Sequence, residues 1–360
     1  MKKFIHISFC TVIGIALVLS IVKFNRQSNV FSTEKRSIAP IPKHITDFKD
    51  WDTCFNDRFG YREQLINLAN FIDYDIIHKT IKNSKAFKGK DGWFFYINAA
   101  DGNNQGDYSK TNLLNEDELA KFKAEIQENA KWCSDNGIKC LFVICPNKHN
   151  VYPEYHILDR PEGITRTEQL LSVFNESGIK CIYPLDYLLE KKKTDTIPLY
   201  YETDTHWNDL GAYYAFEVIK EEVVKMFPNK DFPNIEYKRN VTYSETAGDI
   251  PPMLNIKEAK STRISLSPIK GSFNDYFVYT KNEERDGVIS EGKNKNLPKV
   301  VIFRDSFFTA MTNYLSTLFS NAEYNWRRIT DDDKKSILAN KPDLIIFESV
   351  ERNSVTIAKE

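Results

Sequence analysis

The sequence has almost no excess of charge of either sign. Its 360 residues include 49 Lys and Arg against 50 Asp and Glu, a formal net charge of −1. Dedicated nucleic-acid-binding proteins show a basic face or tail, so we expect no nucleic-acid partner. With 41% hydrophobic and 28% charged residues, the composition is that of a folded protein. The length suffices for one large domain and an accessory piece.

Cysteine is also scarce, and its spacing follows no zinc-binding pattern. Of six cysteines, Cys10 falls in an apolar N-terminal run, which leaves five, an odd number that cannot all pair with one another. We therefore expect mostly free, buried thiols. Cys140 and Cys181 form the one pair to check, because each follows Gly-Ile-Lys at the start of an apolar stretch, and these stretches are expected to be neighbouring parallel strands.

Residues 4–22 contain no Asp, Glu, Lys or Arg, and basic residues flank the run on both sides. The run is about long enough to span a bilayer, and no A-x-A-like cleavage site follows it. These features favour an uncleaved membrane anchor over a signal peptide in residues 1–25. Either reading places the rest of the chain outside the cytoplasm, in the periplasm or at the cell surface, and an uncleaved anchor would hold it at the cytoplasmic membrane.

The rest of the chain alternates helical and strand patterns. We predict a linker and lead-in helix over residues 26–85, then one domain over 86–352 with an insertion at about 228–297. Predicted helices cover 115–136, 165–176, 208–227 and 306–318, and predicted strands cover 138–146, 179–185, 298–303 and 342–350. This rhythm predicts an α/β fold, a three-layer sandwich with a mostly parallel sheet and a β-rich insertion.

The stretch "VVIFRDSFFTAM" (residues 300–311) carries a candidate nucleophile. An apolar strand stops at Arg304 and Asp305, and Ser306 opens the next helix. Reactive groups gather at the carboxyl ends of strands in such sheets, and a helix N-terminus stabilises anionic charge. Ser306 therefore has the setting of an acyl-transfer nucleophile. The alternative is that Asp305 and Ser306 only cap the helix.

The stretch "YYETDTHWNDLGAYYAF" (residues 200–216) carries a candidate base. Asp204 and His206 stand two residues apart and point the same way if the segment is extended, so the carboxylate can orient the imidazole toward a serine. One alternative is a structural histidine in a loop that Asn208 caps. Another is a metal site of Asp204, His206 and Asp209, which lacks an evident third strong ligand. We expect neither a metal nor a cofactor.

These two stretches also carry a resemblance. "DTHWNDLGAY" followed by "FRDSFF" resembles the alginate O-acetyltransferase family (AlgJ/AlgX type), a branch of the SGNH-hydrolase-like superfamily. Five other stretches agree, in the family's order: "FNDRFGYREQL", "GKDGWFFY", "PNKHNVYPEY", "GDIPPML" and "KPDLIIFESVER". Together they cover nearly all of the chain after the N-terminal run, which makes the ordered set more specific than any single motif.

The resemblance implies a Ser306–His206–Asp204 triad that moves an acetyl group, through an acetyl-serine, onto hydroxyls of an exported or cell-envelope polysaccharide. It also implies a membrane-bound O-acyltransferase partner that supplies acetyl groups. Where many relatives have glycine before Asp-Ser, this chain has Arg304, which puts the oxyanion hole in doubt and offers a charge for substrate binding. An acetyl-esterase and an inactive carbohydrate-binding scaffold are the alternatives.

Four further side chains are candidates for a sugar-binding groove. Tyr200, Tyr201 and Trp207 offer aromatic faces beside the Asp-x-His pair, and Lys148 follows a predicted strand in "PNKH". Aromatic residues make up 13% of the chain, so burial in the core is the competing explanation for each of them.

Overall fold

The computed structural model describes residues 14, 18, 39–58, 85–246, 248–256, 258–282 and 287–359. The expected membrane helix at residues 4–22 lies outside these ranges, as does most of the lead-in helix, of which α2 (Phe48–Arg58) is described. Within the described ranges, no helix has both the length and the apolar character that crossing a bilayer requires.

A seven-stranded mixed sheet forms the centre of the domain, with the strand order β4-β3-β11-β9-β10-β8-β7. Its first five strands pair in parallel; β8 then pairs antiparallel to β10, and β7 pairs antiparallel to β8. The strands are β3 (Lys139–Cys145), β4 (Cys181–Ile182), β7 (Phe277–Asn282), β8 (Gly287–Gly292), β9 (Lys299–Phe303), β10 (Asn321–Asn325) and β11 (Leu344–Val350). The carboxyl ends of the five parallel strands therefore share one edge.

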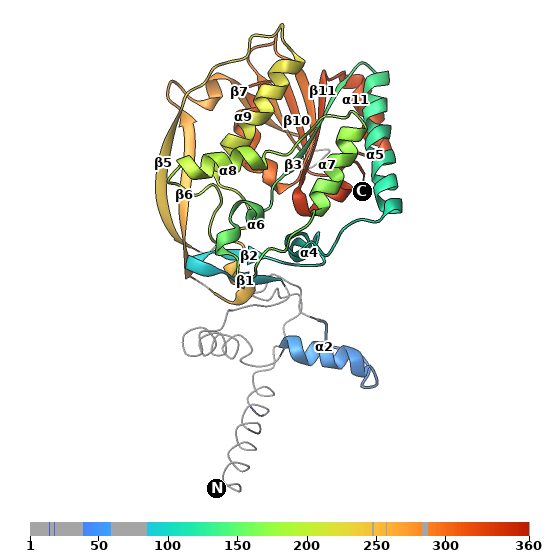
Figure 1. Cartoon of the computed structure of the whole chain (residues 1–360), viewed down its shortest axis with the longest axis vertical. Coiled ribbons are helices and arrows are strands. Elements are labelled where there is room, and N and C mark those ends of the chain that lie inside the picture. Colours follow the sequence, from blue (N-terminus) through green and yellow to red (C-terminus); the bar gives the residue numbers. More distant parts are fainter. Residues whose placement is uncertain are drawn as a thin grey trace.

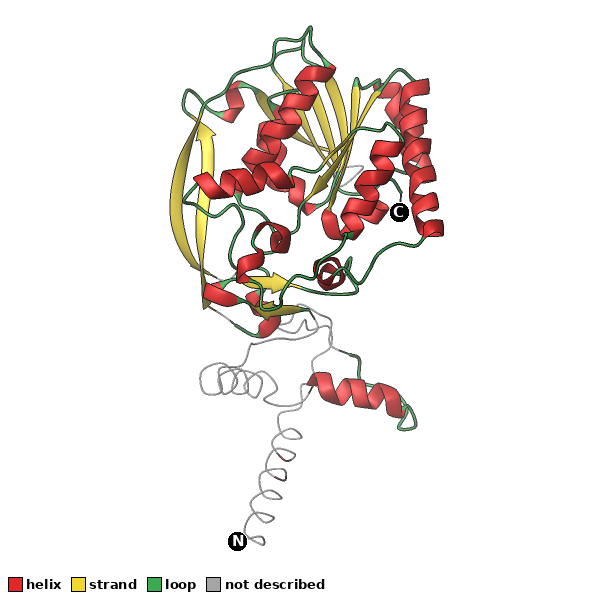
Figure 2. Cartoon of the chain, in the orientation of Figure 1, coloured by secondary structure: helices red, strands yellow, loops and turns green. Residues whose placement is uncertain are grey.

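Helices cover both faces of this sheet (Figures 1 and 2). Side chains alternate along β9, so Val300 and Ile302 join one core cluster while Val301 and Phe303 join the other. The first cluster packs under α8 (Leu185–Thr194), α9 (Asp209–Met226) and α10 (Thr312–Ser316). The second packs under α5 (Glu116–Asp135), α7 (Arg166–Glu176) and α11 (Asp331–Asn340).

Side-chain caps define where the main helices begin. Asn115 with Glu118, and Thr165 with Glu168, form capping boxes at the starts of α5 and α7. Asn208 caps α9: its side-chain oxygen accepts from the backbone N–H groups of Leu210 and Gly211, the second and third residues of the helix, at 3.0 and 3.1 Å. These three helices confirm the predictions to within one residue at each end.

The structure corrects the other helix prediction. Residues 306–318 do not form one α-helix; a 3₁₀ helix, η6 (Ser306–Met311), precedes the short α10. The remaining short helices are α4 (Asn104–Ser109), α6 (Lys148–Val151), η2 (Lys90–Gly92), η3 (Pro153–Tyr155), η4 (Pro251–Leu254), η5 (Phe273–Asp275) and η7 (Glu351–Thr356).

The predicted insertion divides into two parts. β5 (Tyr237–Thr246) and β6 (Glu258–Pro268) form a separate antiparallel ribbon, and β6 packs against α9. β7 and β8 instead extend the central sheet. Ahead of the sheet, β1 (Ala86–Lys88) and β2 (Phe94–Tyr96) make a short hairpin. The segment is thus β-rich but is not a single independent arm.

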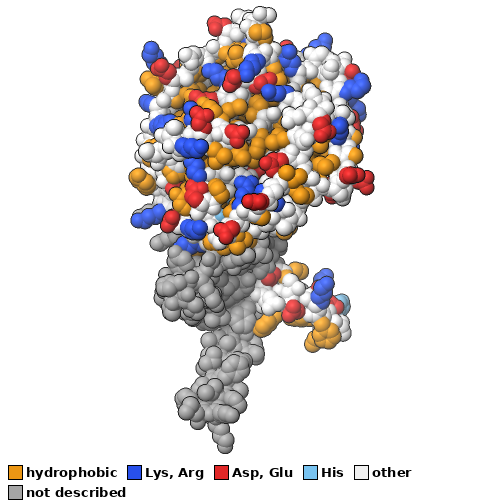
Figure 3. Space-filling view, viewed as in Figure 1, with side chains coloured by type: hydrophobic (Ala, Val, Ile, Leu, Met, Phe, Trp, Pro, Cys, Tyr) orange, Lys and Arg blue, Asp and Glu red, His pale blue; other side chains and the backbone are white. Residues whose placement is uncertain are grey.

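All five cysteines in the described ranges are free. β3 and β4 are parallel neighbours, but their register pairs Phe142 with Cys181 and so offsets Cys181 from Cys140 by two residues. The Cys140 thiol is hydrogen-bonded to Cys133 of α5 instead. On the face shown in Figure 3, basic and acidic side chains are interspersed, in keeping with the net charge of −1.

Candidate active site

Asp204, His206 and Ser306 form one hydrogen-bonded chain. His206 Nδ1 lies 2.7 Å from Asp204 Oδ1, and His206 Nε2 lies 2.8 Å from Ser306 Oγ. Asp204 Oδ1 also accepts from the backbone N–H of His206 at 3.1 Å, which fixes the carboxylate relative to the ring. Both side chains of the pair are partly exposed, 20% for Asp204 and 29% for His206. Solvent or a ligand can therefore reach them.

The loop that carries Asp204 and His206 is closed at its base. Tyr200 and Trp207 form an isolated antiparallel bridge, and Asn208 Nδ2 donates to the carbonyl of Pro198. A Cβ on Gly211, in the first turn of α9, would lie only 2.2 Å from the carbonyl oxygen of Leu199. Glycine is thus required there for the loop and the helix to approach each other so closely.

Asp305 holds the turn before Ser306 against β11. Its Oδ1 accepts from the backbone N–H of Phe307 at 2.9 Å, and its Oδ2 accepts from that of Val350 at 2.7 Å. Asp305 is therefore the cap of η6, the role that the sequence left as one alternative for it. Because the Phe307 N–H is engaged by this cap, it is not free to stabilise an oxyanion.

A buried glutamate lies beneath the same turn. Glu348 of β11 is fully buried, accepts from the backbone N–H of Asp305 at 2.8 Å, and receives the thiol hydrogen of Cys145 at 3.2 Å. Burial, together with the neighbouring charge of Asp305, raises the pKa of Glu348 well above its usual range. Through its bond to the Asp305 N–H, Glu348 supports the Ser306 turn from below.

The electrostatics of the pair favour an ionised aspartate. Burial opposes ionisation, but hydrogen bonds from His206 and the charges of His206 and Lys148 outweigh it and lower the pKa of Asp204 to about 2. A carboxylate in this state accepts the Nδ1–H of the ring and stabilises the imidazolium that forms when Nε2 takes up a proton. Asp204, His206 and Ser306 thus have the geometry and charge of an activated serine.

Lys148 lies under the Asp204 loop and is 5% exposed. Its Nζ donates to the backbone carbonyls of Tyr201, Glu202 and Asp204 at 3.1, 3.2 and 2.7 Å. Burial lowers the pKa of Lys148 to about 7, although the carboxylates of Asp204 and its neighbours act in the opposite direction. The structure places this lysine as a support of the loop, and its three hydrogens are already engaged by the protein.

Two of the aromatic candidates are also core residues. Trp207 is 1% exposed, and its indole N–H donates to the carbonyl of Phe307 at 2.9 Å. Tyr200 is fully buried and donates to the carbonyl of Pro146. Neither ring has a face available for a sugar. Tyr201 is partly exposed, with the guanidinium of Arg263 lying 4.6 Å from its ring centroid.

Arg304 folds over the start of η6. It donates to the carbonyl of Asp305 at 3.0 Å and to the hydroxyl of Thr309 at 2.8 Å. Its guanidinium also lies 4.4 Å from the ring centroid of Trp326, a residue that is 54% exposed and that the sequence reasoning did not select. The signal available in the sequence was a tryptophan directly after a strand, which is weak alone.

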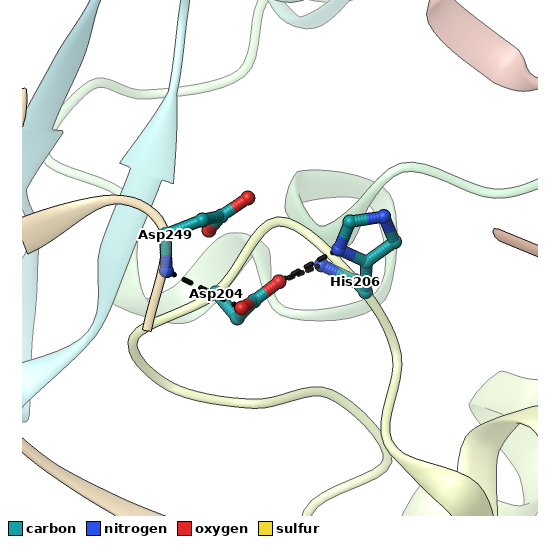
Figure 4. Close-up of side chains that lie close together, drawn as sticks. All are labelled: Asp204, His206 and Asp249. Carbon is teal, nitrogen blue, oxygen red and sulfur yellow. Dashed lines mark hydrogen bonds and ion pairs between the residues drawn. The ribbon is translucent and has the colours of Figure 1, made fainter. Parts of the chain in front are cut away.

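Asp249 is the second residue that sequence reasoning missed, although it stands in the quoted "GDIPPML" stretch. Figure 4 shows Asp204 lying between the His206 ring and the backbone nitrogen of Asp249, which donates to Asp204 Oδ2 at 3.3 Å. The ligand atoms of Asp204, His206 and Asp249 all lie within 4.8 Å of one another. Asp249, rather than Asp209, is therefore the third group that the metal alternative lacked.

The hydrogen bonds argue against a metal at this cluster. Both oxygens of Asp249 accept from Thr205, from the backbone N–H at 2.8 Å and from the hydroxyl at 2.7 Å. His206 Nδ1 bonds Asp204, and Nε2 bonds Ser306. A carboxylate oxygen can accept a hydrogen bond and still bind a cation, but a cation on His206 would have to displace Asp204 or Ser306, because both ring nitrogens are already engaged. The arrangement fits proton transfer better than metal binding.

An α/β sheet with a serine, a histidine and an aspartate hydrogen-bonded in sequence at its edge defines a protein of the serine-hydrolase-like class. Residues 86–292 match a family model described as "SGNH hydrolase-like domain, acetyltransferase AlgX". The match covers more than half of the chain, and the chain belongs to this family. The matched segment includes Asp204 and His206 and ends before Ser306.

Individual relatives are distant. The chain is 23% identical over 244 residues to "Probable alginate O-acetylase AlgJ" of Pseudomonas syringae pv. tomato. That match covers 67% of this chain and 58% of the relative, which is less than two thirds of its length.

Solved structures share the fold. Bacillus cereus PatB1 with a sulfonyl adduct superposes with a TM-score of 0.57 at 16% identity, covering 74% of this chain and 94% of that one. A DHHW family protein from Eubacterium siraeum DSM 15702 has a TM-score of 0.51 at 14% identity, covering 77% and 93%. At such identities the likeness concerns the fold alone.

Proposed function

We propose that this chain is an O-acetyltransferase that carries an acetyl group on Ser306 and passes it to a hydroxyl of an exported or cell-envelope polysaccharide. The observation that carries the proposal is the Asp204–His206–Ser306 hydrogen-bonded chain in a member of an acetyltransferase family. The name of the Pseudomonas syringae relative, an alginate O-acetylase, supports a polysaccharide as the acceptor class.

In the first half-reaction, His206 Nε2 removes the proton from Ser306 Oγ as the oxygen attacks the carbonyl carbon of the acetyl donor. The 2.8 Å Nε2–Oγ distance suits this transfer. The ionised Asp204 stabilises the imidazolium through Nδ1. The proton then passes from Nε2 to the leaving group, the bond between acetyl and donor breaks, and acetyl-Ser306 remains.

In the second half-reaction, the acceptor hydroxyl occupies the place of the departed donor. His206 removes its proton, the sugar oxygen attacks the acetyl carbon, and the proton returns to Ser306 Oγ as the ester bond to the enzyme breaks. Water in place of the sugar would give acetate, so an acetyl-esterase differs from a transferase only in which hydroxyl reaches the acetyl group.

The proposal also includes the location of the protein in the cell. The apolar run at residues 4–22 would anchor the domain to the cytoplasmic membrane, with the active site on the extracytoplasmic side. A membrane-bound O-acyltransferase would then deliver acetyl groups nearby, and no cofactor is needed for the chemistry of Ser306.

The test is to incubate the full-length protein with a chromogenic acetyl ester, with and without an oligosaccharide acceptor. Acetylated sugar formed by the wild type and not by Ser306→Ala supports the transferase. Acetate release that the acceptor does not change favours the esterase. If the wild type and Ser306→Ala are equally inactive, a carbohydrate-binding scaffold is the better description.

A second measurement tests the serine alone. An aryl sulfonyl fluoride should modify Ser306 once per chain, detected by peptide mass spectrometry, because only an activated serine displaces the fluoride. The sulfonyl adduct of Bacillus cereus PatB1 makes this reagent class a natural choice. His206→Ala should slow the modification strongly, and equal labelling of this variant and the wild type would contradict the role assigned to His206.

A further inference from the structure

Asp249 contacts the Asp204–His206 pair from the side opposite Ser306. It belongs to the segment that follows β5, and both of its carboxylate oxygens hold Thr205, the residue between the two members of the pair. Its backbone N–H donates to Asp204 Oδ2 at 3.3 Å (Figure 4). One residue thus contacts the backbone and side chain of Thr205 and the carboxylate of Asp204.

The neighbours of Asp249 fix its position. The backbone N–H of Gly248 donates to the Thr203 hydroxyl at 3.1 Å, and that of Ile250 donates to the Thr203 carbonyl at 3.3 Å. A Cβ on Gly248 would lie 2.3 Å from the same carbonyl oxygen. Residues 248–250 therefore lie directly against residues 203–205, and Asp249 has little freedom to move away.

The Thr205 hydroxyl connects Asp249 to the imidazole. Its oxygen lies 2.7 Å from Asp249 Oδ2 and 3.1 Å from His206 Nδ1. An ionised carboxylate can only accept, so the hydroxyl hydrogen points at Asp249. The oxygen then offers only a lone pair to Nδ1, and Nδ1 must carry the hydrogen for the contact to be favourable. Nε2 is left as the unprotonated nitrogen that faces Ser306.

We propose that Asp249 is a positioning residue that acts through Thr205 to hold His206 in the Nδ1–H tautomer. The inference rests on the proposed function, in which Nε2 is the base. The hydrogen bond between Nδ1 and Asp204 favours the same tautomer. Asp249 therefore adds a second constraint, which also restricts rotation of the ring. Replacing Asp249 by asparagine would place an amide N–H against the threonine oxygen and free the hydroxyl hydrogen to donate to Nδ1.

The test uses full-length Asp249→Asn, Thr205→Val and Thr205→Ser, with ¹⁵N-labelled histidine. In the wild type, the ¹⁵N shifts of His206 should report a protonated Nδ1 and an unprotonated Nε2. Asp249→Asn should show a population of the Nε2–H tautomer, because the freed hydroxyl hydrogen can then be donated to Nδ1. Both Asp249→Asn and Thr205→Val should show a roughly 10- to 100-fold lower kcat, within the range for misplaced general bases. KM for the ester should not change. Thr205→Ser keeps the hydroxyl and should resemble the wild type.

Thr205→Val leaves Asp249 and the backbone in place, so it tests the proposal even if Asp249→Asn does not fold. A wild-type kcat in Thr205→Val, or wild-type ¹⁵N shifts in a folded Asp249→Asn, would overturn the inference. The double variant, Asp249→Asn with Thr205→Val, should have a kcat no lower than that of Thr205→Val alone, because both changes interrupt the same contact with His206. The tautomer is read without turnover, so a chain that lacks acetyltransferase activity would refute the proposed function and still answer this question.

A separate observation concerns the exposed Trp326. Asn325 pairs with Phe303 in the parallel register of β10 and β9, and the backbone N–H of Arg304 donates to the Asn325 carbonyl. Trp326 therefore lies beside Arg304, one strand spacing of ~5 Å away. Arg304 in turn stands two residues before Ser306. Tyr324 and Ile302, two positions earlier, both face the core cluster that contains Trp207. Alternation places Trp326 and Arg304 on that same side.

In the Arg304–Trp326 pair, the arginine is held by hydrogen bonds and the tryptophan is exposed. Arg304 is held by Asp305 and Thr309, and its guanidinium stacks 4.4 Å from the indole centroid. The indole remains 54% exposed. A fixed, exposed aromatic face beside a polar cation suits a pyranose ring, which presents an apolar C–H face and polar hydroxyls at its rim.

We infer that the Arg304–Trp326 pair is a binding subsite for one sugar ring of the polysaccharide acceptor. This inference also rests on the proposed function. Trp326→Ala should raise KM for an oligosaccharide acceptor roughly tenfold, about the effect of one lost ring contact. KM for the chromogenic acetyl ester should be unchanged. Trp326→Phe keeps an aromatic ring, so its KM for the oligosaccharide acceptor should lie between those of the wild type and Trp326→Ala.

Binding can be measured apart from turnover. Full-length Ser306→Ala, titrated calorimetrically with neutral and uronate oligosaccharides, should bind about tenfold more tightly than the same chain with Trp326→Ala added. Equal affinities would overturn the subsite whether or not the wild type transfers acetyl groups. Tighter binding of uronates that disappears in Arg304→Gln would assign the charge preference to Arg304.

Discussion

Replacing Lys148 by methionine should impair activity far more than stability. The substitution keeps a long unbranched side chain between the rings of Trp93 and Phe95 but removes the donor to three loop carbonyls. Loss of the bond to the Asp204 carbonyl releases the segment that orients His206. Displacements near 1 Å in such a segment lower turnover about 100-fold, so we expect kcat to fall roughly 10- to 100-fold.

Two opposing terms set the change in stability. Three carbonyls lose a charged donor, each bond being worth about 1.5–3 kcal/mol. Against this, the pKa of Lys148 falls from 10.5 to about 7 on burial, so keeping the amine protonated costs about 5 kcal/mol at ~1.36 kcal/mol per pKa unit. The difference leaves a net destabilisation of roughly 0–4 kcal/mol for Lys148→Met in acid to neutral solution.

The pH dependence gives the sharper measurement. Between pH 7 and 10.5 the unfolded chain binds the Lys148 proton and the folded chain releases it, so this group makes the wild type more stable as pH rises. Lys148→Met lacks the effect. The free energy of unfolding of the wild type, relative to that of the variant, should therefore increase by about 2 kcal/mol from pH 7 to pH 9.

Urea unfolding of the full-length protein, followed by tryptophan fluorescence at pH 7, 8 and 9, measures this difference. Lys131→Met is the matched control, because the Lys131 side chain is 74% exposed and bonds only Asp135 among the described contacts. The difference in free energy of unfolding between Lys131→Met and the wild type should vary with pH as it would if only Lys148 titrated in both chains, that is, not at all. A pH-independent difference for Lys148→Met, or a wild-type kcat in that variant, would refute the reasoning.

Three further outcomes are expected. Asp204→Asn should lower kcat by about 10²- to 10⁴-fold in the ester assay, because an amide cannot stabilise the His206 imidazolium as a carboxylate does; a smaller loss would argue against the pairing. Incubation with EDTA should leave activity unchanged, since both ring nitrogens of His206 are engaged by Asp204 and Ser306; inactivation reversed by a divalent cation would revive the metal alternative. Glu348→Gln keeps an acceptor for the Asp305 N–H and should be less destabilising than Glu348→Ala, which should lose roughly 1–3 kcal/mol by leaving that N–H unpaired; equal urea midpoints of the two variants would contradict this.

Local signals account for what the sequence predicted well. The starts of α5, α7 and α9 follow from capping side chains within four residues of the helix. The buried strands β9 and β11 follow from unbroken apolar runs. Asp204, His206 and Ser306 could be selected because each stands at a strand end or a capped helix start, and the structure brings them within hydrogen-bonding distance.

What the sequence could not supply depends on distant partners. Asp249 is held by hydrogen bonds from Thr205, 44 residues earlier in the chain. No residue near Asp249 in the sequence indicates that contact. Lys148 resembles an exposed loop lysine until the carbonyls that surround it are known. The strands β7 and β8 carry no local sign that they join the main sheet, because β8 pairs with β10 across the intervening β9, η6 and α10, and β7 joins only through β8.

The position of β11 has a consequence for how the protein folds. This strand lies between β3 and β9 and joins the two parts of the central sheet, yet among the strands that the structure describes it comes last in sequence. Until it emerges, β3 and β9 present unpaired edges, which are templates for aggregation. The sheet can therefore close only after β11, the last of its described strands, has been synthesised. Removal of residues 341–360 would delete all of β11 and leave those two edges exposed.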